Sequence, residues 1–247
     1  MVPRVTSFLY RNDVFFSKED DKMKELKHEL GWFKLFDCTH NIYAISEKYR
    51  DTISTSYLIC GDNQSILLDT GCGIGRMKKL IFSLTSTVPT VLNSHACANH
   101  SSANKKFHLV HILNEEHEID YLTHNYPDEW IASQKKLTED DDTFLPALFT
   151  TLPSGKKYDL GGKTLEVIAN DKTKVNGCML ADRTNKILFC GDIFDETWIS
   201  NLNEDQKAEY IEGCKEIIDE FKDYIWFFSI GEVSNEAKKE SIIKKYA

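Results

Sequence analysis

The feature that most restricts the fold of this chain is a repeated order of short strand signals. Residues 41–46, 54–60 and 64–69 are rich in β-branched and aromatic side chains, and a turn-forming sequence at 61–63 joins the last two runs. The third run has three consecutive aliphatic residues, which is typical of a strand that is buried on both faces. A helix is predicted after it, at residues 75–84. This half of the chain therefore begins as a meander and continues as alternating strands and helices.

A second meander is predicted by the runs at 163–168, 177–182 and 186–190. Asn203 is a predicted N-cap for the helix that follows, and a further apolar strand is expected at 224–230. The helix has apolar residues at a period of 3.6, namely Tyr210, Ile211, Cys214, Ile217, Ile218 and Phe221. Two similar halves of this kind favour an α/β protein in which two mixed β-sheets pack face to face, with helices outside, as a four-layer αββα sandwich.

Two segments fall outside this pattern. Residues 1–36 are predicted to be an N-terminal extension with a short charged helix at 17–30, which precedes a domain at 37–247. Residues 124–157 are irregular and include an acidic run and an apolar patch. They are interpreted as a lid or insertion over a site, or as a solvated loop with one anchoring patch.

Composition excludes several classes of protein. The 247 residues carry a formal net charge of -9, and the basic residues are scattered, so a nucleic-acid partner is not expected. No apolar run approaches the roughly 20 residues that a membrane span needs. The seven cysteines have irregular spacing, which favours a reduced, cytoplasmic protein over a disulfide framework. The expected partner is an unidentified small-molecule substrate or ligand, and no oligomeric state is indicated.

Groups that can bind metals or transfer protons are concentrated at the end of one predicted strand. The β-branched approach at residues 90–92 leads into His95, Cys97, Asn99 and His100, and a helix start follows. Side chains at the mouth of a rigid sheet face a crevice in many α/β proteins. We therefore interpret this cluster as the candidate site, with chance proximity of two histidines and a cysteine as the alternative.

Several motifs along the chain share the order seen in one known family. They are SYLICGDNQSILLDTG, His-x-Cys-x-Asn-His, KTLEVI, KILFCGD and a strand that ends in Gly-Glu. From about residue 37 to the C-terminus, this order resembles the metallo-β-lactamase-fold hydrolase superfamily. The resemblance implies an αββα sandwich with one or two metal ions that activate water. The family's ligands come from H-x-H-x-D-H, a third histidine, an aspartate in a Gly-Asp pair and a last histidine.

The resemblance assigns roles to individual residues, and the pattern is only partly kept. The residues that match metal ligands are His95, His100 and Asp192. Cys97 stands where the family has histidine, and Asn99 where it has aspartate. Thr173 is nearest to the third histidine and Glu232 corresponds to the last one, because every histidine of this chain lies at or before His124. Asp69 is expected to make hydrogen bonds in the turn that supports the ligands.

The remaining ligands are sufficient for one metal ion at most. His95, Cys97 and Asp192 provide imidazole, thiolate and carboxylate, which suit zinc and leave one position for water. The negative thiolate would make that water less acidic than an all-imidazole set does. A second ion has only His100, the neutral oxygen of Asn99 and Glu232. We therefore expect one zinc ion or none.

Two functional classes follow. The first is a hydrolase that acts on an ester, thioester, amide or phosphate, with Asp192 and Asn99 as candidate catalytic residues. The second is an inactive family member that binds a small molecule or a protein. A third chemistry, in which Cys97 is a nucleophile and His95 or His100 its base, has no further support in the sequence.

Overall fold

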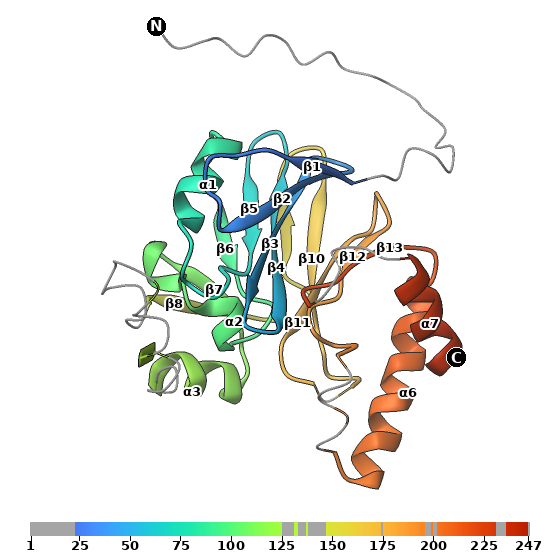
Figure 1. Cartoon of the computed structure of the whole chain (residues 1–247). Coiled ribbons are helices and arrows are strands. Elements are labelled where there is room, and N and C mark those ends of the chain that lie inside the picture. Colours follow the sequence, from blue (N-terminus) through green and yellow to red (C-terminus); the bar gives the residue numbers. More distant parts are fainter. Residues whose placement is uncertain are drawn as a thin grey trace, which may run out of the picture.

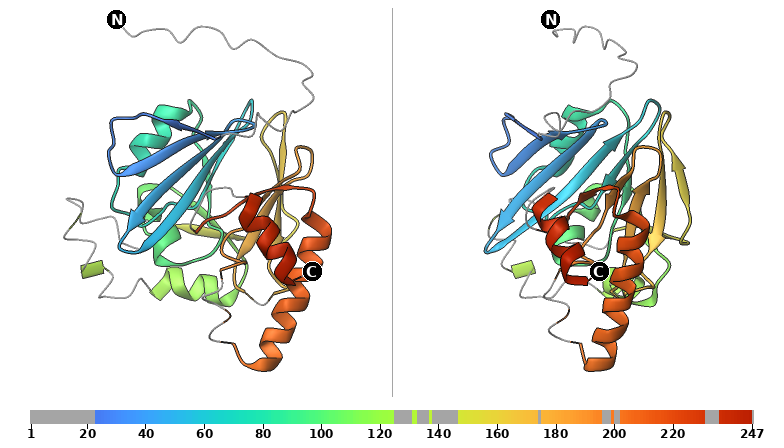
Figure 2. Two further views of the ribbon diagram at one scale, coloured as in Figure 1. Left: turned by 45° about the vertical axis from the view of Figure 1, so that its right-hand side comes forward. Right: turned by 90° about the vertical axis from the view of Figure 1, so that its right-hand side faces the viewer.

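The computed structural model describes residues 23–124, 131–132, 137, 147–173, 175–195, 199, 202–230 and 236–246. Within them, two mixed sheets pack face to face, with helices on both outer faces (Figures 1 and 2). The first sheet has eight strands in chain order, and the second has five, in the order β13-β12-β11-β10-β9. The predicted α/β sandwich with two mixed sheets is confirmed.

The first sheet changes from antiparallel to parallel pairing at β5. Its strands are β1 (Lys24–Leu26), β2 (Phe33–Cys38), β3 (Ile42–Tyr49), β4 (Thr52–Cys60), β5 (Ser65–Leu68), β6 (Thr90–Leu92), β7 (Val110–Leu113) and β8 (Phe149–Leu152). The helices that follow its parallel strands are α1 (Met77–Leu84), α2 (Ala98–Ser101) and α3 (Glu116–His124), with a 3₁₀ turn at Asn104–Lys106. Because β5 and β6 are parallel, the segments that leave their carboxyl ends lie at the same edge of the sheet.

The second sheet contains the predicted meander, preceded by one strand that was not predicted, and ends with a parallel pair. Its strands are β9 (Lys157–Asp159), β10 (Thr164–Ala169), β11 (Cys178–Asp182), β12 (Ile187–Phe189) and β13 (Ile225–Phe227). Helices α6 (Glu204–Phe221) and α7 (Glu236–Tyr246) cover its outer face (Figure 1). Asn203 caps α6 as predicted. The predicted apolar stripe of α6 is buried except at Ile211, which is 39% exposed.

The core lies in three layers that match the sandwich. The apolar cluster between the sheets includes Tyr57, Phe189 and Phe227, whose ring centroids are 5.1 to 5.5 Å apart. The Tyr57 hydroxyl donates to the carbonyl of Phe228 across the sheets, at 2.5 Å. Separate clusters fill the space under α1 and α3 and under α6 and α7. Each helix pair therefore packs on the outer face of a sheet.

One local prediction was wrong, and another lies mostly outside the described residues. The helix expected at 17–30 is contradicted by β1, which pairs antiparallel with β2, so the first sheet crosses the predicted domain boundary at residue 36. Residues 17–22 lie outside the described part. In the predicted lid at 124–157, residues 125–130, 133–136 and 138–146 also lie outside it, but 149–152 form β8 of the first sheet. In the described part of the chain, no helix has the length and apolar character needed to cross a bilayer.

Candidate metal centre

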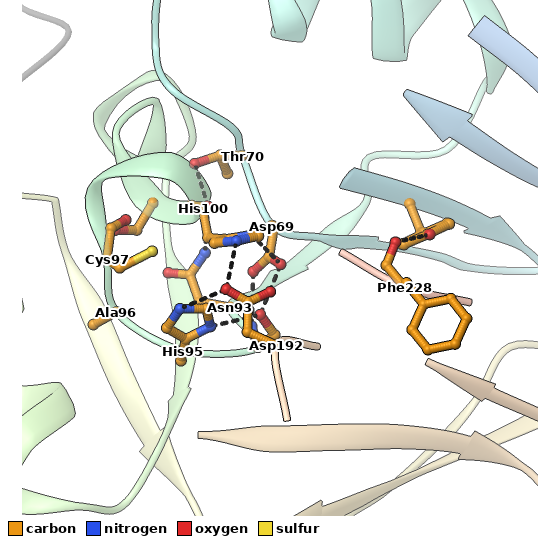
Figure 3. A network of polar contacts seen from close by, with 12 residues as sticks. Asp69, Thr70, Asn93, His95, Ala96, Cys97, His100, Asp192 and Phe228 are labelled. Carbon is orange, nitrogen blue, oxygen red and sulfur yellow. Dashed lines mark hydrogen bonds and ion pairs between the residues drawn. The ribbon is translucent and has the colours of Figure 1, made fainter. Parts of the chain in front are cut away.

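The strands deliver the candidate ligands to one edge of the sandwich. His95 and Cys97 lie in the segment between β6 and α2, and His100 lies on α2. Asp192 follows β12 of the other sheet, in the turn at 191–194. The side chains of His95, His100 and Asp192 converge between the two sheets (Figure 3). The fold thus joins two stretches of chain that are about 90 residues apart.

The distances within this cluster are short. The candidate ligand atoms of His95, Cys97 and His100 all lie within 4.8 Å of one another. The Oδ2 atom of Asp192 lies 3.4 Å from Nε2 of His95 and 3.2 Å from Nε2 of His100. Both histidines and Asp192 are buried, whereas Cys97 is half-buried. The structure therefore brings together the four residues that the sequence proposed as ligands.

Asp69 supports this cluster from the end of β5. Its Oδ1 accepts the Ser94 N–H at 2.7 Å, and its Oδ2 accepts the Ser94 hydroxyl at 2.7 Å. The same Oδ2 lies 3.0 Å from Nδ1 of His100. A proton on Nδ1 satisfies this contact, so Nε2 is the ring nitrogen that faces Asp192. The backbone of Asp69 has a φ of 66°, which Asp tolerates better than most residues.

Polar contacts around the cluster fix the backbone that carries the ligands. The Thr70 N–H donates to the His100 carbonyl at 2.7 Å, and the Asn104 amide donates to the side-chain oxygen of Asn93 at 2.7 Å. From the other sheet, the Cys178 N–H donates to the Ser94 carbonyl at 2.7 Å. Gly177, next to it, allows this approach, since a Cβ there would lie 2.6 Å from Cβ of His95.

Charges in the cluster shift the protonation of its members. Burial lowers the pKa of His95, but the neighbouring Cys97 and Asp192 outweigh it and raise that pKa to about 9. The pKa of His100 is also raised, because Asp192, Cys97 and Asp69 outweigh its burial. Conversely, burial raises the pKa of Asp192 and of Cys97, and the two histidines more than offset it, so both pKa values are lowered. Without metal, the cluster holds imidazolium beside anionic groups.

Three other predicted residues have different positions. Asn99 is half-buried on α2, between Cys97 and His100 in sequence. The Thr173 hydroxyl donates to the side-chain oxygen of Asn170 at 2.8 Å and accepts the Val175 N–H, so its contacts lie within its own turn. Glu232 lies outside the described residues. Sequence reasoning missed Asn93 and Ser94, although both directly precede His95 at the strand end where the motif begins.

The cluster fits one transition-metal ion. Among the described residues, Oδ1 of Asp192 is buried without a hydrogen-bond partner, and Nε2 of His100 meets only Oδ2 of the same carboxylate, at 3.2 Å. Buried polar atoms are rarely left unpaired, and an unpaired oxygen at the centre of this cluster is available to a further ligand. Imidazole, thiolate and carboxylate are donors that zinc accepts. These residues therefore suit zinc in both chemistry and spacing.

Comparison with known proteins agrees with this geometry. The family model described as the metallo-beta-lactamase superfamily matches residues 49–196, which cover more than half of the chain. The chain belongs to this superfamily. No curated protein matches the sequence. The matched region contains β4, β5 and every ligand candidate of the cluster, so membership rests on the part of the chain that forms the site.

Solved structures share the fold at low sequence identity. A metallo-beta-lactamase from Pontibacter korlensis is 13% identical, with a TM-score of 0.58 over 86% of this chain and 99% of that one. A metallo-beta-lactamase family protein from Thermus thermophilus is 15% identical, with a TM-score of 0.58 and coverages of 83% and 78%. Rubredoxin oxygen:oxidoreductase from Desulfovibrio gigas is 14% identical, with a TM-score of 0.52 and coverages of 91% and 60%. Such neighbours show the shared fold and leave the reaction open.

Proposed function

We propose that this chain is a hydrolase that works with a single transition-metal ion, with zinc as the first candidate. The observation that supports the proposal is the convergence of His95 and His100 on one oxygen of Asp192, with Cys97 beside them. The proposed substrate is an ester, thioester, amide or phosphate, since activated water can attack each of these groups.

The ligand set favours one ion over two. If a complete zinc site of four ligands contributes roughly 10–16 kcal/mol, each ligand accounts for about 3 kcal/mol, or about two decades of affinity. Asn99 offers a neutral oxygen where the family has an aspartate, and Thr173 stands nearest to the position of the third histidine. A second ion would lose several decades of affinity from these changes, whereas the first keeps a thiolate from Cys97.

The residues of the site would have different roles in this reaction. A zinc ion, when bound, polarises the substrate oxygen and lowers the pKa of water. His95, Cys97 and Asp192 would hold it, and Asp69 would orient His100 through Nδ1. The Oδ1 atom of Asp192 has no hydrogen-bond partner among the described residues, so it is our candidate to accept a proton from the attacking water. Asn99 is the candidate donor to the developing oxyanion.

A non-catalytic role is the second candidate, and one observation favours it. His100 points Nε2 at the same Asp192 oxygen as His95 does, so four donors surround one position. Four protein ligands complete a tetrahedral zinc site and leave no position for water. In that case the chain would keep the fold for stability and bind a small molecule or a protein.

The test is elemental analysis and Co²⁺ spectroscopy of untagged protein, compared with Cys97→Ser. We expect one ion per wild-type chain, a thiolate-to-cobalt absorption band, and hydrolysis of a model ester or phosphodiester. Cys97→Ser should lose the band and lower metal affinity by about 100-fold, because a neutral hydroxyl replaces the thiolate. Cys60→Ser is the matched control, since Cys60 is also half-buried but lies on β4 away from the ligands.

Each outcome separates the candidates. One ion with measurable hydrolysis supports the hydrolase. One ion with four protein ligands and no hydrolysis supports the non-catalytic role. Two tightly held ions per chain would contradict the argument for a single ion, and a metal-free protein that Cys97→Ser leaves unchanged would remove the mechanism.

A further inference from the structure

Glu118 of α3 is a buried acid that the proposed mechanism does not use. It is only 1% exposed, although it lies in an acidic stretch that is otherwise largely exposed to solvent. Its Oε2 accepts a hydrogen bond from the backbone N–H of Ala96. Its Oε1 is buried without a hydrogen-bond partner among the described residues, with Nδ1 of the exposed His117 3.8 Å away. Burying a carboxyl group costs free energy, so the buried position of Glu118 needs a structural explanation.

The position of Ala96 in the chain makes its hydrogen bond to Glu118 important for the site. Ala96 separates His95 from Cys97, and both are candidate ligands (Figure 3). One turn further along α3, Tyr121 interacts with the backbone of Ala98, on the other side of Cys97. Residues three apart lie on the same face of a helix. We call residues 94–98, which carry His95 and Cys97, the ligand loop. One face of α3 therefore contacts this loop on both sides of Cys97.

The opposite side of this loop is held by other elements. Asp69 accepts the Ser94 N–H, and Cys178 of β11 donates to the Ser94 carbonyl. Neither contact reaches beyond Ser94. On the other side, the Cys97 carbonyl accepts the Ser101 N–H of α2 at 2.9 Å, so the Ala96 N–H between these two anchors is the group that α3 holds. The helix does not need the carboxyl group for its own attachment, because Leu122 and Ile119 pack in the apolar cluster under the first sheet.

The geometry points to Glu118 as a positioning residue for the metal ligands: by accepting the Ala96 N–H, it sets the direction of His95 and Cys97. This inference rests on the proposed metal site and deepens it. Groups that orient metal ligands typically change metal affinity by 10–100-fold when they are removed. The hydrogen-bond acceptor, and not the negative charge, is the property that the loop requires.

The experiment compares Glu118→Gln, which keeps an acceptor oxygen, with Glu118→Met, which keeps the volume and loses the acceptor. Glu116→Gln is the control, because Glu116 is exposed on the same helix. Metal-free full-length proteins are titrated with Co²⁺ against a chelator, and the thiolate-to-cobalt band is recorded. We expect Glu118→Met to lower affinity by about 10-fold to 100-fold and to shift the band. Glu118→Gln and Glu116→Gln should stay within about 3-fold of the wild type, the usual context-dependent spread.

Hydrogen exchange of the Ala96 amide in the metal-free proteins gives a second readout. Exchange should accelerate in Glu118→Met and stay slow in Glu118→Gln. The inference would be overturned if Glu118→Met had the Co²⁺ affinity, absorption band and Ala96 amide exchange of the wild type. It would also be overturned if Glu118→Met and Glu118→Gln lost the same amount of Co²⁺ affinity. If the wild type binds no Co²⁺, the proposed function fails, and amide exchange still decides whether Glu118 positions the loop.

Discussion

At the scale of single residues, Asp69 is the most connected acid of the site. Its two carboxylate oxygens contact the Ser94 N–H, the Ser94 hydroxyl and the His100 ring, all within 3.0 Å. The side chain thereby links β5 to the ligand loop and to α2. Its positive φ places the carboxyl group where all three contacts can form, and Asn is the residue best able to keep that backbone.

Asp69→Asn should therefore weaken the site without changing the turn. One oxygen becomes an amide group that cannot accept a hydrogen bond, so either Ser94 or His100 loses its acceptor. We expect a loss of about 1–3 kcal/mol in the free energy of unfolding and about 10-fold to 100-fold in Zn²⁺ affinity. Urea denaturation and chelator competition measure the two quantities. Ser94→Ala removes the hydroxyl contacts with Asp69 (2.7 Å) and with Nδ1 of His95 (3.2 Å) but keeps the contact of Asp69 with His100, so it should show a smaller loss of affinity. Equal losses would contradict the assigned role of the His100 contact.

At the scale of elements, α6 shows how local sequence determines a boundary. The Asn203 side chain accepts the Gln206 N–H at 2.9 Å, and the Gln206 side chain accepts the Asn203 N–H at 3.0 Å. This capping box satisfies two backbone donors at the helix start. The remainder of the helix is held by its apolar face, which includes Tyr210, Cys214 and Phe221.

Asn203→Ala should lower the free energy of unfolding by about 1 kcal/mol, because one helix donor loses its acceptor. Asn203→Asp keeps the acceptor and should stay within a few tenths of a kcal/mol of the wild type. Urea denaturation checks both values, provided that the free energy of unfolding has the same slope against urea concentration in each protein. Metal content should not change in either variant, since α6 carries none of the candidate ligands.

Elements with a local signal could be predicted from the sequence, and those that depend on tertiary pairing could not. The meanders and α6 have periodic patterns and capping residues, and they lie where expected. β1 does not: Lys24–Leu26 has a charged, helix-like sequence, but pairing with Leu35–Asp37 of β2 determines its conformation. Motif order also predicted that His95, Cys97, His100 and Asp192 lie close together. The sequence gives no indication that Glu118 is buried. It is one of several acidic residues on a predicted helix, and such residues are usually exposed to solvent, so its role depends on its contact with the backbone of Ala96.

At the scale of the whole molecule, the metal-free site makes stability depend on pH. The pKa of His95 is raised from 6.5 to about 9, so its contribution to stability is complete below pH 6.5 and is lost as the pH rises through 9. Above that value, His95 no longer offsets the negative charge of Asp192. Asp192 has a lowered pKa, so its contribution is present above its ordinary value of 3.8 and is lost as the pH falls further.

We therefore expect the free energy of unfolding of the metal-free protein to fall between pH 6.5 and about pH 9, the interval over which His95 loses its proton. Zn²⁺ should reverse the trend, since protons compete with metal for imidazole and thiolate and this competition weakens at high pH. Urea denaturation with chelator and with Zn²⁺ measures both slopes. His95→Gln should make the metal-free slope shallower, and the part that remains is assigned to His100, whose pKa is also raised. A wild-type slope already flat would contradict the assignment of the charged cluster.

The four candidate ligands differ in exposure, and this difference has a kinetic consequence. His95, His100 and Asp192 are buried, and only Cys97 among them is half-exposed. An ion would therefore approach and depart past the sulfur, which makes Cys97 the first ligand to be met and the last to be released. The rate at which a bound ion exchanges with metal in solution would then depend on the thiolate fraction of Cys97, and not on the buried candidate ligands.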